Sequence, residues 1–350
     1  MASLTQIAVT TRKIIRYSIF FIIFLIIGRI ILGIGIGIFN KVFPAPPPPA
    51  TIAFGPLPKI TFPDNKNLPT LTYTLQTPTG ELPKMPIQAT VYRMPKEASN
   101  LSSLDATKRK AAALGFTNEP VSESQTLYKF THPIVPATLE MNIVTGVFSV
   151  SYDLSKDPTP ISQRPPSPEV AADNVKSYLK GAGLLPDDIE AGTSTHDFLK
   201  IENKQLVPAI SLSESSLIKV NFFREEYDKM PSLTPHPAQG NIWFLVAGSQ
   251  TREKIVIGGE FHYFPIDATL SSTYPIKTPQ VAYEELSSGK GYIADLGLNS
   301  TGNVTIRKVY LAHFDPDTQM DFFQPIYVFE GDNGFIAYVP AITDSYYLQK

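Results

Sequence analysis

The stretches SPEVAADNV (residues 167–175) and TPQVAYEEL (residues 278–286) resemble each other, and each is typical of a helix start. The leading Ser or Thr can accept a hydrogen bond from a backbone N–H that would otherwise stay unpaired. The proline that follows occupies the first helical position, where no N–H is needed. Because Gly181 and Gly289 can end a helix, the sequence predicts helices over 167–181 and 278–289.

A third helix is predicted over residues 103–114, before Gly115, although it lacks the leading proline. Each helix precedes several segments with the alternating apolar pattern of strands. In chain order these segments are 127–130, 139–144, 148–152, 198–202, 206–210, 217–223, 243–247, 254–264, 304–314, 326–330 and 335–339. Thr145-Gly146 and Asn333-Gly334 are turn signals that join neighbouring strands into hairpins.

One helix packed on an antiparallel sheet is therefore the repeated unit, and the predicted fold class is α+β. The helix is expected to bury one face of its sheet. We expect three such units, over residues 71–160, 161–270 and 271–350. The first unit opens with two alternating segments, 71–76 and 87–92, that are predicted to form a hairpin.

Residues 17–39 read YSIFFIIFLIIGRIILGIGIGIF and predict a transmembrane helix. A helix of this length would rise roughly 34 Å, enough to cross the hydrocarbon core. A secretory signal peptide has a shorter apolar region that ends at small residues, so an uncleaved anchor is favoured. Three basic residues lie within residues 1–16, whereas only Lys41 closely follows the span. The positive-inside rule then places the N-terminus in the cytoplasm and the bulk of the chain outside the plasma membrane.

Three residues of this span are candidate contacts for a membrane partner. Arg29 lies near its middle, where a charge costs about 2.5–3.5 kcal/mol. Arg29 either extends toward the membrane surface, or the helix shifts its register in the membrane, or Arg29 meets an acidic group of another membrane helix. Gly33 and Gly37 have the small-xxx-small spacing that permits close helix packing, although this spacing also occurs by chance. The expected partners are the lipid bilayer, a membrane or envelope protein, and a second copy through this helix.

Prolines dominate residues 40–70, which include the run PAPPPP at 44–49. Proline favours the extended polyproline II conformation and disfavours helices and central strands. We therefore expect 40–70 to be a stiff linker that holds the folded part away from the membrane.

Composition excludes several classes of function. The chain has 350 residues, no cysteine and a net charge of −2. Without cysteine there is no thiolate catalysis, no zinc–cysteine site and no disulfide. The charge gives no basic footprint for nucleic acid. No phosphate-binding loop or metal motif is present, so no cofactor is expected.

The sequence contains candidate reactive groups at four places. Glu260 and His262 share a strand face and are interpreted as a solvated pair. The run of Asp315, Asp317 and Asp321 lacks the glycine and distal glutamate of a calcium loop, so a polar turn is expected. In the two S-x-x-K stretches, Ser216 and Lys219 point to opposite strand faces, and Ser177 and Lys180 lack companion motifs. No catalytic residue is predicted.

The C-terminal stretch carries a family resemblance on four segments: 278–282, Gly289-Lys290-Gly291, 306–314 and 324–329. With one N-terminal anchor, no cysteine and repeated helix-then-strands units, the chain resembles the YycH/YycI regulators and the PepSY-type modules. The resemblance covers about a quarter of the chain. It implies a membrane-anchored protein outside the cell that restrains a sensor histidine kinase, and it implies no catalytic residues.

Three functions remain open on this sequence. The first is a membrane-anchored extracytoplasmic binding or regulatory module, which the absence of catalytic motifs favours. The second is a structural or assembly component of the cell envelope that oligomerises through its glycine-bearing helix. The third is an envelope hydrolase whose carboxylates are distant in sequence but close in space. Two buried carboxylates at a cleft would favour the hydrolase, and an exposed apolar patch would favour the binding module.

Overall fold

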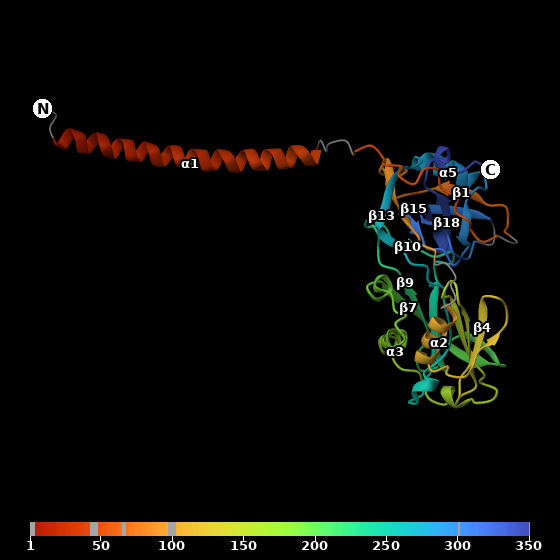
Figure 1. The fold of residues 1–350 in the computed structure, drawn as a ribbon. Helices are drawn as coiled ribbons and strands as arrows, with labels where there is room; N and C mark the ends of the chain where they lie inside the picture. Colours follow the sequence, from red (N-terminus) through yellow and green to blue (C-terminus); the bar gives the residue numbers. More distant parts are fainter. Residues whose placement is uncertain (1–3, 43–47, 65–67, 97–102, 300–301, 350) are drawn as a thin grey trace. The chain divides into compact units, whose positions relative to one another are not determined.

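A computed structural model describes residues 4–42, 48–64, 68–96, 103–299 and 302–349 (Figure 1). The chain divides into two units, residues 1–49 and residues 50–350. The predicted run of prolines at 44–49 lies mostly outside the described residues, since only Pro48 and Pro49 belong to them.

The first unit contains a single long helix, α1 (Leu4–Val42). Its apolar part runs from Val9 to Phe39, spans 31 residues and is exposed throughout. The predicted apolar helix is confirmed, and it begins earlier than residue 17, so that the basic residues before the span are helical too. By length and composition α1 can cross a membrane, which fits an anchor or a signal sequence.

The second unit is α+β, as predicted, and its sheets are mostly antiparallel. Its helices are α2 (Ser103–Ala113), α3 (Pro168–Gly181), the single turn α4 (Asp187–Glu190) and α5 (Pro279–Ser287). Ser167 caps α3 by accepting a hydrogen bond from the Val170 N–H at 3.5 Å. Thr278 caps α5 in the same way, with 3.3 Å to the Val281 nitrogen. These are the two helix starts that the sequence predicts.

Nine strands form one antiparallel sheet in the order β3-β4-β5-β6-β12-β11-β9-β7-β8. They are β3 (Val121–Ser122), β4 (Leu127–Thr131), β5 (Ala137–Asn142), β6 (Phe148–Tyr152), β7 (Thr193–Glu202), β8 (Gln205–Pro208), β9 (Leu217–Phe223), β11 (Ile242–Val246) and β12 (Val256–Phe261). Residues of α2 and α3 pack into one apolar core with this sheet. Because β6 pairs with β12, strands from the predicted units 71–160 and 161–270 share one continuous layer.

The second sheet has the order β1-β15-β17-β18-β14, with β10 also paired to β15. Its strands are β1 (Thr72–Leu75), β10 (Ser232–Leu233), β14 (Tyr292–Asp295), β15 (Asn303–Phe314), β17 (Pro325–Gly331) and β18 (Ile336–Pro340). Helix α5 packs on β18. The strands β1 and β10 run parallel to β15, and the other pairs are antiparallel.

A third, small sheet pairs β13 (Asp267–Pro275) and β16 (Phe322–Phe323) with β2 (Gln88–Arg93). The predicted hairpin of 71–76 and 87–92 is therefore wrong, because β1 pairs with β15 and β2 pairs with β13. The connection over 77–86 contains Pro78, Pro83 and Pro86, and such a segment does not form a tight hairpin turn. Strand β13 also crosses the predicted boundary at residue 270.

Part of the predicted linker belongs to the fold. Leu57 is fully buried and Ile60 is 8% exposed. The ring of Phe62 stacks on Tyr292 with centroids 4.9 Å apart. Leu57 joins the main core of the second sheet, whereas Ile60 and Phe62 pack on the opposite face of that sheet. The sheet is therefore covered on both faces, although burial of one face was expected. The spacer interpretation is wrong for this part, since buried apolar area outweighs the extended preference of proline.

Candidate ligand-binding site

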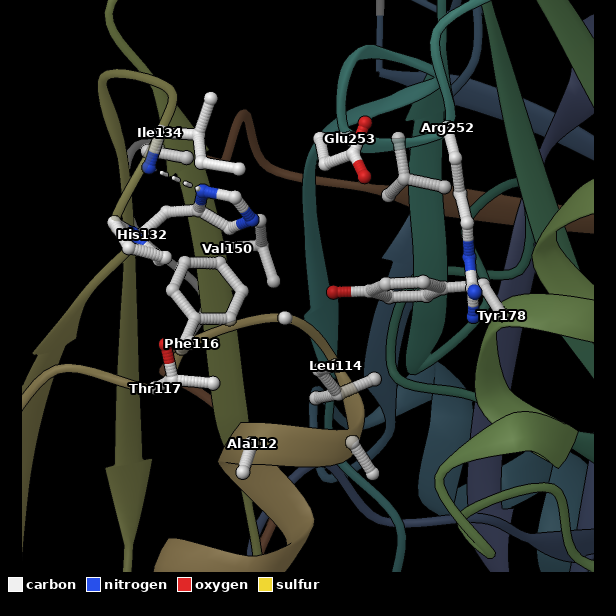
Figure 2. A pocket seen from close by; sticks show the side chains of 15 residues that line it. Ala112, Leu114, Phe116, Thr117, His132, Ile134, Val150, Tyr178, Arg252 and Glu253 are labelled. Atoms are coloured by element: carbon white, nitrogen blue, oxygen red, sulfur yellow. Dashed lines mark hydrogen bonds between the residues drawn. The ribbon is translucent and has the colours of Figure 1, made fainter.

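A cavity of about 280 Å³ lies in the second unit, at the C-terminal end of α2 (Figure 2). Its walls come from segments far apart in the sequence: the end of α2, the turn between β4 and β5, helix α3, and the short 3-10 helix η2 (Arg252–Lys254). The residues that carry the argument are Leu114, Phe116, His132, Tyr178, Arg252 and Glu253, which we call the η2 pocket.

His132 forms one wall with a fixed orientation. Its Nδ1 accepts hydrogen bonds from the backbone N–H groups of Ile134 and Val135, at 3.2 and 3.3 Å. The neutral ring therefore carries its proton on Nε2, which is a free donor on the cavity side (Figure 2). Burial lowers the pKa of His132, and the carboxylate of Glu253 opposes this only in part. The ring is thus a neutral donor near pH 7.

Gly115 allows His132 to sit this close to α2. The Phe116 N–H bonds the Ala111 carbonyl at 2.9 Å and the Gly115 N–H bonds the Ala112 carbonyl at 3.0 Å, which closes the helix end. Gly115 takes the left-handed conformation with a φ of +101°. A Cβ at this position would lie 3.0 Å from Nε2 of His132. Both the turn and the pocket wall therefore need glycine here.

Three polar groups of the opposite wall are uncommitted. The Tyr178 ring packs edge-on against Phe244, with centroids 6.1 Å apart, and its hydroxyl points into the cavity (Figure 2). In the part of the chain that the structure describes, the Tyr178 hydroxyl, the Arg252 guanidinium and the Glu253 carboxylate form no hydrogen bond or ion pair. Tyr178 is half-buried, whereas Arg252 and Glu253 are exposed at the rim, so all three groups are open to a ligand.

The segment that carries Arg252 and Glu253 is held in place by the next residue. Lys254 reaches away from the cavity, pairing with Asp157 at 2.7 Å and donating to Thr159 Oγ1 at 2.9 Å. Tyr152 donates to the same Asp157 carboxylate at 2.6 Å. These bonds, that of Lys254 foremost, hold the pKa of Asp157 well below its usual range. The backbone that carries Arg252 and Glu253 is therefore anchored before any ligand arrives.

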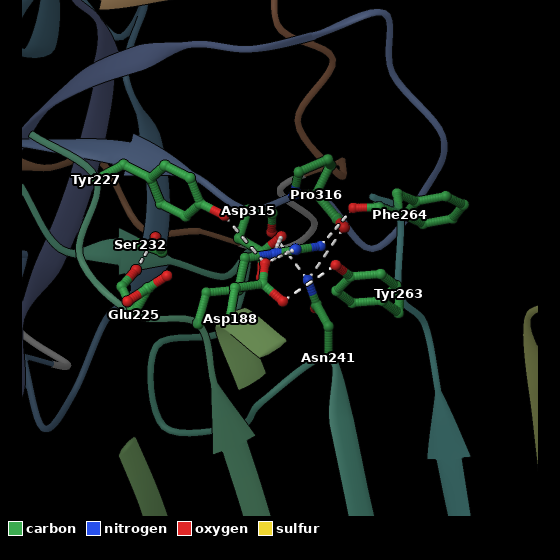
Figure 3. Close-up of polar contacts among 10 residues, drawn as sticks. Asp188, Glu225, Tyr227, Ser232, Asn241, Tyr263, Phe264, Asp315 and Pro316 are labelled. Atoms are coloured by element: carbon green, nitrogen blue, oxygen red, sulfur yellow. Dashed lines mark hydrogen bonds and ion pairs between the residues drawn. The ribbon is translucent and has the colours of Figure 1, made fainter. Parts of the chain in front are cut away.

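A second polar centre lies in the second unit around Arg224 (Figure 3). Its guanidinium pairs with Asp188 at 2.5 Å and with Asp315 at 2.8 Å, and it donates to the Phe264 carbonyl at 2.6 Å. The Tyr263 ring lies under the guanidinium at 4.3 Å, and its hydroxyl donates to Asp188. Burial opposes the charge, but the two carboxylates outweigh it and the pKa of Arg224 is raised.

The charged side chains of this centre are buried and paired with one another. The Arg224 side chain is 1% exposed, and those of Asp188 and Asp315 are 10% and 6% exposed. Asp188 lies in α4, next to the nine-stranded sheet, whereas Asp315 follows β15 of the second sheet. The ion pairs therefore tie the two sheets together.

The three predicted residues of the membrane span lie on one face of α1. Arg29, Gly33 and Gly37 follow each other at four-residue intervals, which places them side by side along the helix. Arg29 is exposed, and a Cβ on either glycine would meet nothing within 4 Å. The side chain of Lys41, which follows the span, lies outside the described side chains.

The residues of the candidate catalytic motifs contact other partners instead of one another. Lys180 pairs with Glu190 at 2.8 Å rather than with Ser177. Lys219 donates to Gln239 at 2.8 Å, and its ammonium lies 4.5 Å from the centre of the Trp243 ring. Glu260 accepts a bond from the Trp243 indole at 3.2 Å, and its nearest approach to His262 is 3.8 Å.

The three aspartates of the predicted polar turn have separate surroundings. Asp315 pairs with Arg224, and Asp321 pairs with Lys96 at 2.9 Å. The backbone carbonyl of Asp317 lies 3.1 Å from Nδ1 of His262. Among the residues described, no group of three or more His, Cys, Asp or Glu side chains could hold a metal ion.

Sequence reasoning missed the residues of the η2 pocket and of the Arg224 centre. Tyr178 lies between Ser177 and Lys180, the two residues that the S-x-x-K pattern singles out, but no motif marks it. Arg252 and Glu253 precede the predicted strand 254–264 as ordinary surface charges. These residues come together only through tertiary contacts, so no local sequence spacing could predict that they share a site.

Comparison with known proteins gives little further information. No protein-family model matches the chain, and no curated protein shows significant similarity to it. Among solved structures, it is similar to an uncharacterized protein from Eubacterium rectale, with 10% sequence identity and a TM-score of 0.40. That match covers 75% of this chain and 86% of the other.

Proposed function

We propose that this protein is a single-pass membrane protein that holds residues 50–350 outside the cytoplasm as a binding and regulatory module. The observation that carries the proposal is the exposed apolar part of α1, which is 31 residues long. A fully exposed apolar helix is costly in water and stable in a bilayer. The proposal assigns no catalytic residue.

The distribution of charge supports the orientation. Arg12, Lys13 and Arg16 lie on the N-terminal side of the predicted span, and only Lys41 closely follows it. Basic residues stay on the cytoplasmic side of the plasma membrane. The N-terminus is then cytoplasmic and the C-terminal unit extracytoplasmic.

The η2 pocket supports a binding role. It combines apolar side chains with uncommitted polar groups, which is the usual make-up of a small-molecule site. The resemblance to the YycH/YycI regulators, stated above on 278–329, supports the finer proposal that binding regulates a membrane sensor.

The face of α1 that carries Arg29, Gly33 and Gly37 favours a second candidate function. Glycines at four-residue spacing with no neighbouring atom leave room for a second helix. An envelope assembly component that oligomerises through α1 would use the same face.

The experiment that tests the proposal is topology mapping of the full chain. We expect a C-terminal reporter that works only outside the cytoplasm to be active, and the mature protein to keep its N-terminus in the membrane fraction. Exchanging Arg12, Lys13 and Arg16 for Glu is the matched control and should reduce the active fraction. A cytoplasmic C-terminus would contradict the proposed topology. A mature chain that begins after α1 would replace the anchor with a signal sequence.

Membrane crosslinking separates the two functions. If Arg29 pairs with an acidic group of another protein, Arg29→Leu should keep insertion but lose the crosslinked partner. Recovery of only a second copy of this chain would favour the assembly component instead.

A further inference from the structure

We propose that the η2 pocket binds a small zwitterion with an apolar body, of the class of the free aliphatic or aromatic amino acids. The proposal rests on the proposed binding function and names its ligand class. It does not depend on α1, so topology and ligand can be tested separately.

The size and the floor of the pocket favour a small apolar group. Leu114 and Phe116 are 6% and 3% exposed, and Val150, which also lines the cavity, is 5% exposed. The volume of about 280 Å³ lies just below the usual range for ligand sites, about 300–1,000 Å³. A side chain the size of leucine or phenylalanine suits such a space, and a nucleotide or a sugar chain does not.

The charges at the rim decide the class of ligand. Arg252 and Glu253 both line the cavity, and neither forms an ion pair within the described residues. An anionic ligand would satisfy Arg252 but would be repelled by Glu253, and a cationic ligand would meet the reverse problem. A zwitterion satisfies both. The planar guanidinium matches a carboxylate, and the carboxylate of Glu253 accepts from an ammonium group.

The neutral donors complete the site. Nε2 of His132 and the hydroxyl of Tyr178 face each other across the cavity, from the β4–β5 turn and from α3 (Figure 2). Both can donate to a ligand carboxylate. The two backbone donors already orient the His132 ring and Lys254 anchors the backbone of η2, so part of the site is ordered before binding.

The test uses isothermal titration calorimetry on the full chain in lipid nanodiscs with four probes. L-leucine and L-phenylalanine are zwitterions, 4-methylpentanoate is leucine without its ammonium group, and 3-methylbutylamine is leucine without its carboxylate. We expect saturable binding of at least one amino acid with a Kd of about 1 mM or tighter. Each leucine analogue should bind at least about tenfold more weakly than leucine, the factor for one lost charge-assisted bond.

Two variants distinguish a binding role of Arg252 and Glu253 from a purely structural role, because each should affect some probes and not others. Arg252→Gln should weaken leucine binding and leave 3-methylbutylamine unchanged. Glu253→Gln should weaken leucine binding and leave 4-methylpentanoate unchanged or tighter, because a like charge is removed. Arg109→Gln, at an exposed position on α2 outside the lining, is the matched control and should change nothing.

Two results would overturn the proposal. One is no saturable binding of either amino acid by the folded wild-type chain. The other is equal affinity for leucine and 4-methylpentanoate, which would make the ligand a simple carboxylate. Either result would leave the proposed topology standing, because the reporter experiment does not depend on the pocket.

Discussion

At the scale of single residues, Gly115 meets two independent demands. Its backbone has a φ of +101°, and a Cβ there would lie 3.0 Å from the His132 ring. Gly146 shares only the first demand, since its φ is +73° and a Cβ would meet nothing within 4 Å. Comparing alanine substitutions at Gly115 and Gly146 therefore separates the cost of backbone strain from the cost of the steric clash with His132.

We predict that Gly115→Ala destabilises the protein more than Gly146→Ala. Both variants should lose about 1–2 kcal/mol from left-handed strain, and the first should lose more because His132 must move. Urea unfolding followed by the fluorescence of Trp243, the single tryptophan of the chain, measures the difference. Equal losses of unfolding free energy in the two variants would show that the His132 ring moves without an energetic penalty. His132 would then not have a fixed orientation in the pocket.

His313 on β15 makes the folded state sensitive to acid. Its side chain is fully buried, its Nε2 donates to the Thr90 carbonyl at 3.0 Å, and its Nδ1 has no hydrogen-bond partner among the residues that the structure describes. The ring stacks on Phe323 at 4.8 Å. Burial lowers the pKa of His313 to about 4, because a charged ring would be desolvated.

We predict that stability falls as pH drops from about 6.5 to about 4. In this window the unfolded chain binds a proton at residue 313 that the folded chain does not bind. The loss attributable to this residue is at most roughly 3 kcal/mol. His313→Gln should flatten the dependence of unfolding free energy on pH, and His236→Gln, at an exposed position, should not. If the pH dependence of the unfolding free energy were unchanged in His313→Gln, titratable groups other than His313 would cause that dependence.

At the scale of elements, local patterns were sufficient for α1, α2, α3 and α5 and for most strands, whereas the single turn α4 was not predicted. The caps at Ser167 and Thr278 and the turn at Gly115 depend on the chemistry of a few neighbouring residues. Strands β9 and β15 are rich in apolar and β-branched residues, and their predicted bounds agree with the structure within a residue. The two-residue strands β3, β10 and β16 are too short to carry a periodic signal.

Pairing between elements could not be predicted from the same patterns. An alternating segment identifies a strand but not its partner, so β1 and β2 were wrongly joined. Strand β13 was missed because its sequence DATLSSTYP is largely polar and exposed in its first half. The η2 pocket and the burial of Leu57 arise from long-range contacts, for which no local spacing exists.

At the scale of the second unit, the Arg224 centre joins two sheets that have separate cores. Removing the cation alone would leave Asp188 and Asp315 buried without a counter-charge. A loss of this kind costs about 3–5 kcal/mol, whereas an exposed pair contributes less than about 1 kcal/mol. The pair of Lys180 and Glu190, with side chains 68% and 45% exposed, provides the matched control.

We predict that Arg224→Met lowers the unfolding free energy by about 3–5 kcal/mol and that Lys180→Met changes it by less than about 1 kcal/mol. Because the centre links the two sheets, Arg224→Met should also make them unfold in separate transitions. Trp243 fluorescence monitors the unfolding of β9–β11, and amide hydrogen exchange monitors that of β15–β17. Adding Asp188→Asn and Asp315→Asn should restore part of the loss, since no buried charge then remains unpaired. A single unchanged transition in Arg224→Met would mean that apolar packing, rather than these ion pairs, holds the two sheets together.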